Sequence, residues 1–101
     1  MKLFVDDIRD APDNSWVIAR NFDSVIEILQ HSPVSIISLD HDLGTDQSGY
    51  DIAKWIEKKV FCDGLYPIPE ILCHSQNPVG KKNILAVNEA IQKHFNNFPA
   101  K

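Results

Sequence analysis

Residues Val34 to Asp40 read VSIISLD, a nearly continuous apolar run that ends in a carboxylate. Such a run is typical of a strand that is buried on both faces of a sheet. Two similar runs, Lys2 to Asp6 (KLFVD) and Glu70 to His74 (EILCH), also end in a polar residue. The sequence therefore predicts three buried strands, each followed by polar side chains.

Helical segments alternate with these strands. Asn21 can cap a helix that runs to about His31. The residues SGYD at 48–51 have the form of a capping box before a second helix, which Gly64 would end. Asn77-Pro78 can open a last helix, and its buried face would carry Ile84, Val87, Ile91 and Phe95.

A weaker strand, Trp16 to Arg20, lies between the first strand and the first helix. Its connection to the first strand is about eight residues long, whereas a parallel crossover usually takes a dozen or more, so the direction of this strand stays open. The alternation of strands and helices predicts a three-layer α/β fold. It would be a mostly parallel, four-stranded sheet with helices on both faces, in one domain over residues 1–101.

The composition excludes several classes of function. The net charge of −4 argues against extended DNA binding, which usually needs a basic face. There is neither a signal peptide nor an apolar stretch near the ~20 residues that cross a bilayer, so we expect a soluble, cytoplasmic protein without membrane contact. Cys62 and Cys73 lie among apolar neighbours and follow no zinc or redox spacing, so we expect inert core thiols.

Carboxylates gather where the strands end. In an open parallel sheet the ligand site lies outside the carboxyl ends of the strands, so Asp6, Asp7 and Asp40 should meet at one edge. Two like charges about 4 Å apart repel by roughly 4 kcal/mol at an effective dielectric near 20. Arg9 would offset only part of this repulsion. We therefore predict that the three aspartates bind Mg²⁺ or Mn²⁺, with Asp42 in support.

Histidines follow two of the predicted strands, at His41 and His74. Because histidine readily takes up and releases protons near neutral pH, both are predicted to be catalytic residues. Which of them would be the acid and which the base stays open. Asp40 belongs to the predicted catalytic set as well as to the metal set.

The third polar cluster surrounds the start of the last helix. Free backbone N–H groups at a helix start favour an anion such as phosphate, a glycine lets the backbone approach closely, and adjacent lysines add positive charge. An arginine is also suited to phosphate because of its fork of donors. The predicted phosphate-binding residues are Arg9, Ser75, Asn77, Gly80 and Lys81.

These residues resemble two related families. Asp6, Asp7, Asp40 and Ser75 match the positions at which the receiver domains of response regulators bind Mg²⁺ and accept a phosphoryl group, the acceptor being Asp40 here. The chain is more similar to the receiver-like family described as cyclic-phosphate-processing. The shared motifs are DDIR at 6–9, LDHDLG at 39–44, GYD at 49–51 and HSQNPVG at 74–80. This resemblance covers nearly the whole chain and implies a role on cyclic phosphates of RNA ends or nucleotides.

The chain also departs from ordinary receivers. A loop through Pro12 replaces the first helix, and no fifth strand ending in a lysine follows the last helix. The lysine that normally contacts the aspartyl phosphate is therefore missing, although Lys81 or Lys82 could substitute from a different place. The resemblance thus implies a truncated receiver-like (flavodoxin-like) fold.

Three functions fit these features. The first is an enzyme that hydrolyses a cyclic phosphate on an RNA end or nucleotide with a metal ion, with His41 and His74 sharing the acid and base roles. The second is a signalling module in which Asp40 is phosphorylated. The third is a non-catalytic module that binds a nucleotide or a partner protein at the same edge. The first explains the two histidines, which the phosphotransfer set of receivers lacks. The oligomeric state stays open.

Overall fold

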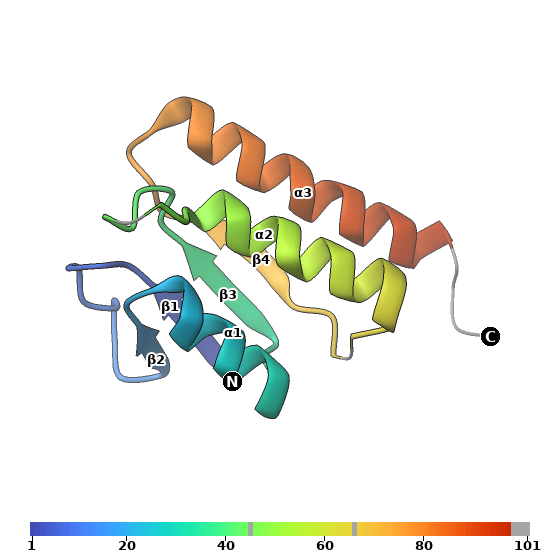
Figure 1. Ribbon diagram of the computed structural model, residues 1–101, viewed down its shortest axis with the longest axis horizontal. Coiled ribbons are helices and arrows are strands. Elements are labelled where there is room, and N and C mark those ends of the chain that lie inside the picture. Colours follow the sequence, from blue (N-terminus) through green and yellow to red (C-terminus); the bar gives the residue numbers. More distant parts are fainter. Residues whose placement is uncertain (45, 66, 98–101) are drawn as a thin grey trace.

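A computed structural model describes residues 1–44, 46–65 and 67–97 (Figure 1). Its strands are β1 (Lys2–Val5), β2 (Trp16–Ala19), β3 (Ile36–Leu39) and β4 (Glu70–Cys73). They form one sheet in the order β2-β1-β3-β4, and all three neighbouring pairs are parallel. The direction of β2, which the sequence leaves open, is therefore parallel to β1.

The β1–β2 connection contains no helix. Because a strand of four residues rises only about 13 Å, the loop over residues 6–15 is long enough to return along it. Arg20 holds this loop in place. Its Nη1 donates to the carbonyl oxygens of Arg9 (2.7 Å) and Asp6 (3.3 Å), and its Nη2 pairs with Asp10 (3.0 Å). The predicted loss of the first receiver helix is thereby confirmed.

The helices are α1 (Phe22–His31), α2 (Gly49–Lys58) and α3 (Pro78–Asn97). Both predicted caps are present, since Asn21 accepts the N–H of Ser24 and residues 48–51 form the capping box. A π-helical turn, η1 (Lys59–Asp63), continues α2 as far as Gly64, and the sequence does not predict it. On α3, Ile84, Val87 and Ile91 are buried as predicted, whereas the side chain of Phe95 lies outside the described residues.

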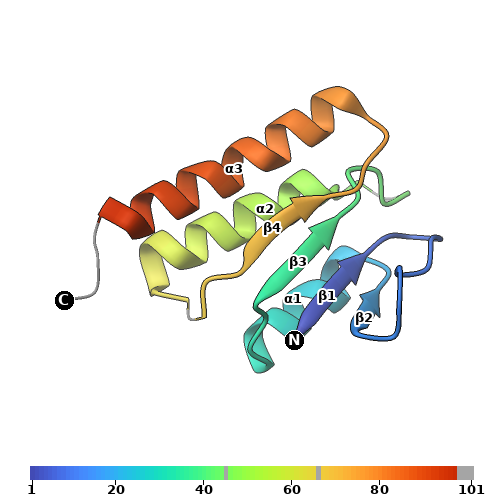
Figure 2. The same cartoon turned by 180° about the vertical axis from the view of Figure 1, so that it is seen from behind.

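The helices are arranged differently from the prediction of a layer on each face. α1 and α2 cover the same face of the sheet, and Figure 2 shows the strands in front of both helices. The crossovers β2–α1–β3 and β3–α2–β4 step in the same direction and are right-handed by rule, so they place their helices on one side. Leu3, Val5 and Ile37 are fully buried there, whereas Ile18 and Leu72 on the other face are each 38 % exposed.

The third helix covers the outer edge of β4 rather than the middle of a face. Asn88 on α3 accepts a hydrogen bond from the backbone N–H of Ile71 on β4 (2.9 Å). This is the edge at which the fifth strand of a receiver would pair. Within the described residues no fifth strand is present, and the truncated receiver-like α/β fold is confirmed.

The two cysteines differ in their surroundings. Burial raises the pKa of the Cys73 thiol, in keeping with the prediction of a core position. Cys62 lies in the π-helical turn and is exposed, so its predicted place in the core is wrong. Among the residues that the structure describes, no helix is long and apolar enough to span a membrane.

Candidate functional site

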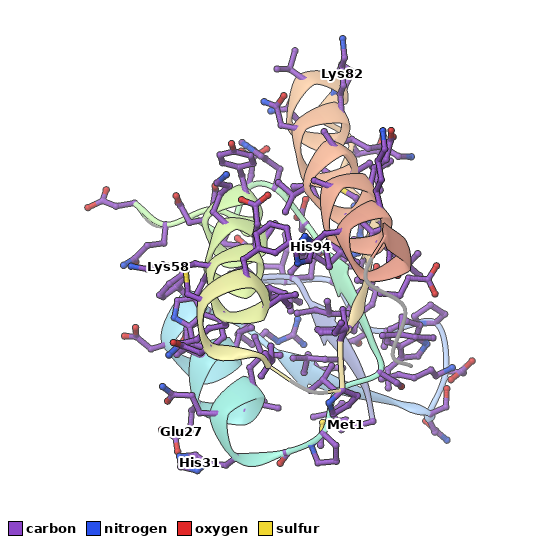
Figure 3. All side chains as sticks on the ribbon, turned by 90° about the vertical axis from the view of Figure 1, so that its right-hand side faces the viewer. Met1, Glu27, His31, Lys58, Lys82 and His94 are labelled. Carbon is purple, nitrogen blue, oxygen red and sulfur yellow. The ribbon has the colours of Figure 1, made fainter. Side chains whose placement is uncertain are left out.

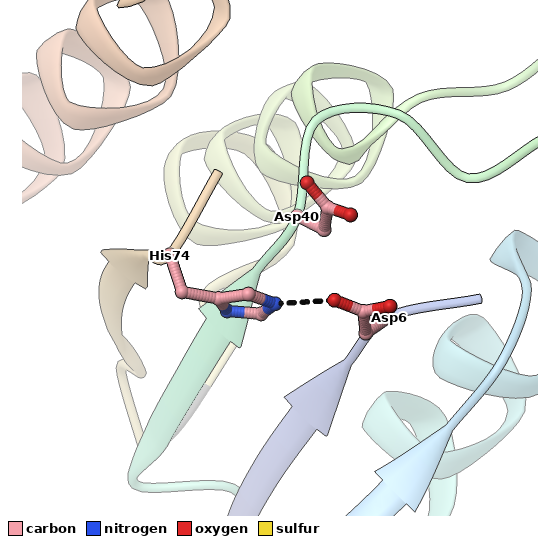
Figure 4. Close-up of side chains that lie close together, drawn as sticks. All are labelled: Asp6, Asp40 and His74. Carbon is pink, nitrogen blue, oxygen red and sulfur yellow. Dashed lines mark hydrogen bonds and ion pairs between the residues drawn. The ribbon is translucent and has the colours of Figure 1, made fainter. Parts of the chain in front are cut away.

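The carboxyl ends of three strands bring Asp6, Asp40 and His74 together (Figure 4). Each residue directly follows its strand, β1, β3 or β4. One possible ligand atom from each side chain lies within 4.8 Å of the others. The predicted convergence at one edge of the sheet therefore holds for these residues, which are far apart in the sequence.

Asp6 is the most deeply buried member of this group, with only 1 % of its surface exposed. Its Oδ1 accepts the backbone N–H groups of Ile8 (3.0 Å) and Arg9 (2.7 Å), and its Oδ2 hydrogen-bonds Nε2 of His74 (3.0 Å). Burial alone would raise the pKa of Asp6. The hydrogen bonds from Arg9, Ile8 and His74 outweigh that effect, so the pKa stays below the ordinary 3.8 and the group is a carboxylate.

The imidazole of His74 is held on three sides. Its Nδ1 lies 2.8 Å from Oγ of Ser38, its Nε2 meets Asp6, and its ring stacks on Phe4 with centroids 4.2 Å apart and planes 10° apart. Phe4 and Ser38 are paired neighbours on β1 and β3, and they are only 4 % and 7 % exposed. The ring therefore lies across the face of the sheet that α1 and α2 leave uncovered.

Arg9 lies beside this pair. Its Nε is 3.8 Å from Oδ2 of Asp6, and its Nη1 donates to the carbonyl oxygen of His74 (3.4 Å). The side chain is still 49 % exposed. Its guanidinium can therefore contact an anion in solution while it stays anchored at the site.

His41 follows Asp40 in the chain and has a different environment. Its Nδ1 pairs with Oδ1 of Asp42 (3.1 Å), and its side chain is 24 % exposed. The ring packs against Gly80 so closely that a Cβ there would lie 2.4 Å from Cγ of His41. Gly49 also packs closely, because a Cβ added there would lie 2.0 Å from the carbonyl oxygen of Asp40. These two glycines let α2 and α3 begin directly against residues 40 and 41.

The start of α3 is already capped by its own side chains. Oγ of Ser75 accepts the N–H of Asn77 (3.0 Å), and Oδ1 of Asn77 accepts the N–H of Gly80 (3.0 Å). Lys81 and Lys82 are exposed near the start of α3. The structure thus gives Gly80 a packing role against His41, and phosphate binding by these residues stays a prediction.

Asp7 and Asp42 lie outside the group formed by Asp6, Asp40 and His74. Asp42 is 73 % exposed and pairs with His41, and Oδ2 of Asp7 lies 3.1 Å from the place a Cβ would take at Gly44. Their role as metal ligands stays a prediction. Two carboxylates and an imidazole are donors that fit a divalent transition metal, so the group suits a cation.

Three residues of the site escape the sequence prediction: Phe4, Arg20 and Ser38. Ser38 does leave a signal, because it is the one polar residue within the apolar strand IISL. A buried hydroxyl needs a hydrogen-bond partner, and a histidine after the next strand is within reach. Phe4 and Arg20 leave no comparable signal, since a phenylalanine in a strand is ordinary and Arg20 acts on backbone oxygens.

The other two histidines lie at the surface. His31 is 65 % exposed at the end of α1 and pairs with the exposed Glu27 (3.0 Å; Figure 3). His94 is exposed near the end of α3, where Phe61 packs edge-on against its ring. His31 therefore offers a control position for substitutions at the site.

A parallel sheet in the order β2-β1-β3-β4, with aspartates after β1 and β3, defines a receiver-like domain. Residues 1–90 match the family model described as cyclic-phosphate processing receiver domain, and the chain belongs to this family. The family resemblance predicted from the motifs is thereby confirmed. Comparison with curated proteins and with solved structures gives no match.

Proposed function

We propose that this domain hydrolyses a cyclic phosphate on a nucleotide or an RNA end and that it requires a divalent cation. The observation that carries the proposal is the meeting of Asp6, Asp40 and His74 at one edge of the sheet. The family description, which names cyclic-phosphate processing, points to the same chemistry.

Asp6 and Asp40 supply the oxygen donors for the cation. When bound there, a divalent ion neutralises charge on phosphate oxygens and lowers the pKa of water. Asp6 supports this role because its carboxylate is ionised and is held in place by two backbone N–H groups. Asp40, which is partly exposed, faces the same point.

Arg9 positions the phosphate. Its guanidinium is anchored between Asp6 and the carbonyl oxygen of His74, so its remaining N–H groups can donate to phosphate oxygens. Lys81, which is exposed in the first turn of α3, would add positive charge.

Proton transfer falls mainly to His41. In the reaction, a water oxygen bonds to phosphorus, the bond from phosphorus to one ribose oxygen breaks, and that oxygen takes up a proton while water loses one. Asp42 orients His41 through Nδ1, and the ring is partly exposed. His74 has partners at both ring nitrogens, which leaves it less free to exchange a proton.

The test is turnover of a panel of 2′,3′-cyclic and 3′,5′-cyclic nucleotides and RNA ends with a cyclic phosphate, with Mg²⁺, Mn²⁺ or a chelator. Wild type should open at least one of them with metal, and Asp40→Asn should be inactive. Asp63→Asn is the matched control, because Asp63 is an exposed carboxylate paired with Lys59 beyond α2.

Two outcomes would contradict the proposal. One is full turnover in the presence of chelator. The other is a stable, stoichiometric phospho-Asp40 from acetyl phosphate with no turnover of any cyclic phosphate, which would favour a signalling module instead.

A further inference from the structure

The two ring nitrogens of His74 have different partners: Nδ1 meets Ser38, and Nε2 meets Oδ2 of Asp6. Oγ of Ser38 can either donate to Nδ1 or accept a hydrogen bond from Nδ1–H, and in the second arrangement Nε2 turns its lone pair towards the Asp6 carboxylate 3.0 Å away. A lone pair and a carboxylate oxygen at this distance repel each other unless a positive charge lies between them. That charge is either a proton or a metal ion.

Asp40 adds a third donor at the same point, since its ligand atom lies within 4.8 Å of those of Asp6 and His74. The three side chains come from three different strands, so the sheet fixes their spacing. The ring of His74 cannot swing away easily, because Phe4 stacks on it and Ser38 holds Nδ1.

We infer that His74 is a metal ligand, which completes with Asp6 and Asp40 a site that prefers a transition metal such as Mn²⁺ to Mg²⁺, and that Ser38 is its positioning residue. The inference deepens the proposed function, on whose cation it rests. Among divalent first-row transition metals, affinity for a site with nitrogen and oxygen donors rises from Mn²⁺ to Cu²⁺, and imidazole suits the later members best. Mg²⁺ takes oxygen ligands and gains little from an imidazole.

The role of Ser38 follows from the chemistry of metal-bound histidines. Such a histidine usually donates its other ring N–H to a neighbouring acceptor, which fixes the tautomer and the direction of the lone pair. Ser38 is only 7 % exposed. Among the described residues of the site, it is the one whose side chain meets Nδ1 of His74. Its hydroxyl is therefore suited to hold Nδ1–H and to leave Nε2 for the metal.

Metal affinity tests this without any substrate. Mn²⁺ and Mg²⁺ binding would be measured by calorimetry and by competition on wild type, His74→Gln, Ser38→Ala and the control His31→Gln. We expect Ser38→Ala to lose about 10- to 100-fold in Mn²⁺ affinity and His74→Gln to lose more. Mg²⁺ affinity should change far less in both variants, and His31→Gln should bind both ions as wild type does.

A second measurement uses wild type alone, so it does not depend on how the variants fold. Zn²⁺ is diamagnetic and takes imidazole ligands. Its addition to ¹⁵N-labelled protein should move the side-chain Nε2 resonance of His74 and leave that of His31 in place. An unmoved Nε2 resonance at saturating Zn²⁺, or wild-type Mn²⁺ affinity in a folded His74→Gln protein, would overturn the inference.

The two proposals can fail separately. If Mn²⁺ binding depends on His74 but no cyclic phosphate is turned over, the proposed function fails and the metal site stands. If turnover needs a cation but His74→Gln binds Mn²⁺ as tightly as wild type does, the inference fails and the proposed function stands.

Discussion

The two histidines at the edge of the sheet follow equivalent strand ends but lie in opposite surroundings. His74 has a partner at each ring nitrogen and an aromatic ring beneath it, and it spans from β4 to β1. His41 pairs with one exposed aspartate and packs against a glycine. A ring with both nitrogens engaged is fit to hold a ligand in a fixed place. A ring with one nitrogen engaged and a partly exposed edge is better suited to move a proton.

Removal of the His41 imidazole should have the strongest effect on turnover. In His41→Gln we expect turnover of the cyclic phosphate to fall by about 10²–10⁴-fold, or roughly 3–5 kcal/mol of barrier, because a positioned proton-transfer group is lost. Mn²⁺ affinity should stay at its wild-type value. Steady-state kinetics and metal titration measure both quantities.

His31→Gln is the control for this variant, since it removes an exposed histidine from α1 and should leave turnover intact. If His41→Gln keeps nearly full turnover, His41 is a structural residue and the contrast between the two rings has no catalytic meaning.

The contact between His41 and Gly80 gives the next largest effect. In Gly80→Ala the new Cβ would lie 2.4–2.8 Å from three atoms of His41, so the ring has to move. We expect unfolding free energy to fall by about 1–2 kcal/mol, because overpacking costs about 1–3 kcal/mol and the better helix propensity of alanine returns up to ~1 kcal/mol. Urea unfolding measures this loss.

Val79→Ala is the neighbouring control, because Val79 is 67 % exposed and should change stability by less than about 0.5 kcal/mol. Equal stability of Gly80→Ala and wild type would show that the close packing of α3 on His41 is not needed.

The stack beneath His74 should have a smaller but measurable effect. Phe4→Leu keeps an apolar side chain but loses the stack on His74 together with the edge contact to Trp16, so we expect a loss of about 1 kcal/mol in unfolding free energy. Phe61→Leu is the comparison, because it also removes a ring contact between a phenylalanine and a histidine, here His94. Phe61 is 42 % exposed. Phe61→Leu should cost less, and a larger loss there than at Phe4 would contradict the importance of the stack.

The smallest effect concerns acid stability. The pKa of Asp6 is lower in the folded protein than its ordinary 3.8, so its contribution to stability is complete above that value and is lost as pH falls through the folded pKa. Urea unfolding from about pH 6 down to about pH 2 should show this decline, and Asp6→Asn should flatten it.

Asp13→Asn provides the comparison. The side-chain and backbone hydrogen bonds of Ser15 also lower the pKa of Asp13, but that carboxylate is exposed, so its variant should change the acid profile less. An unchanged acid profile in Asp6→Asn would show that the buried carboxylate is not what destabilises the domain at low pH.

Most of the fold follows from local sequence signals. The apolar runs before Asp6, Asp40 and His74 are the strands β1, β3 and β4, and the caps at Asn21 and Ser48 start helices where predicted. These signals suffice because buried strands and helix caps depend on neighbouring residues. The parallel direction of β2 and the shared face of α1 and α2 depend on tertiary contacts and on the handedness of crossovers, which no local pattern contains.

The candidate site could likewise be predicted from the sequence only in part. The rule that ligands bind at the carboxyl ends of parallel strands brings Asp6, Asp40 and His74 to one edge. It cannot say which nitrogen of His74 meets Asp6, or that His41 turns towards Gly80, because both depend on side-chain packing across elements. The polar residue inside β3, Ser38, is the signal that would have extended the prediction furthest.

The hydrogen bond between Asn88 and Ile71 has a consequence for how this domain tolerates change. An added strand shields a sheet edge with backbone groups, which every non-proline residue carries, so almost any sequence can serve there. Here one side-chain oxygen shields the Ile71 amide of β4, and most amino acids in place of Asn88 could not accept that hydrogen bond. The shortened fold therefore depends on the identity of residue 88. A substitution that cannot accept this hydrogen bond would leave the buried Ile71 N–H without its partner, at a cost of about 1–3 kcal/mol.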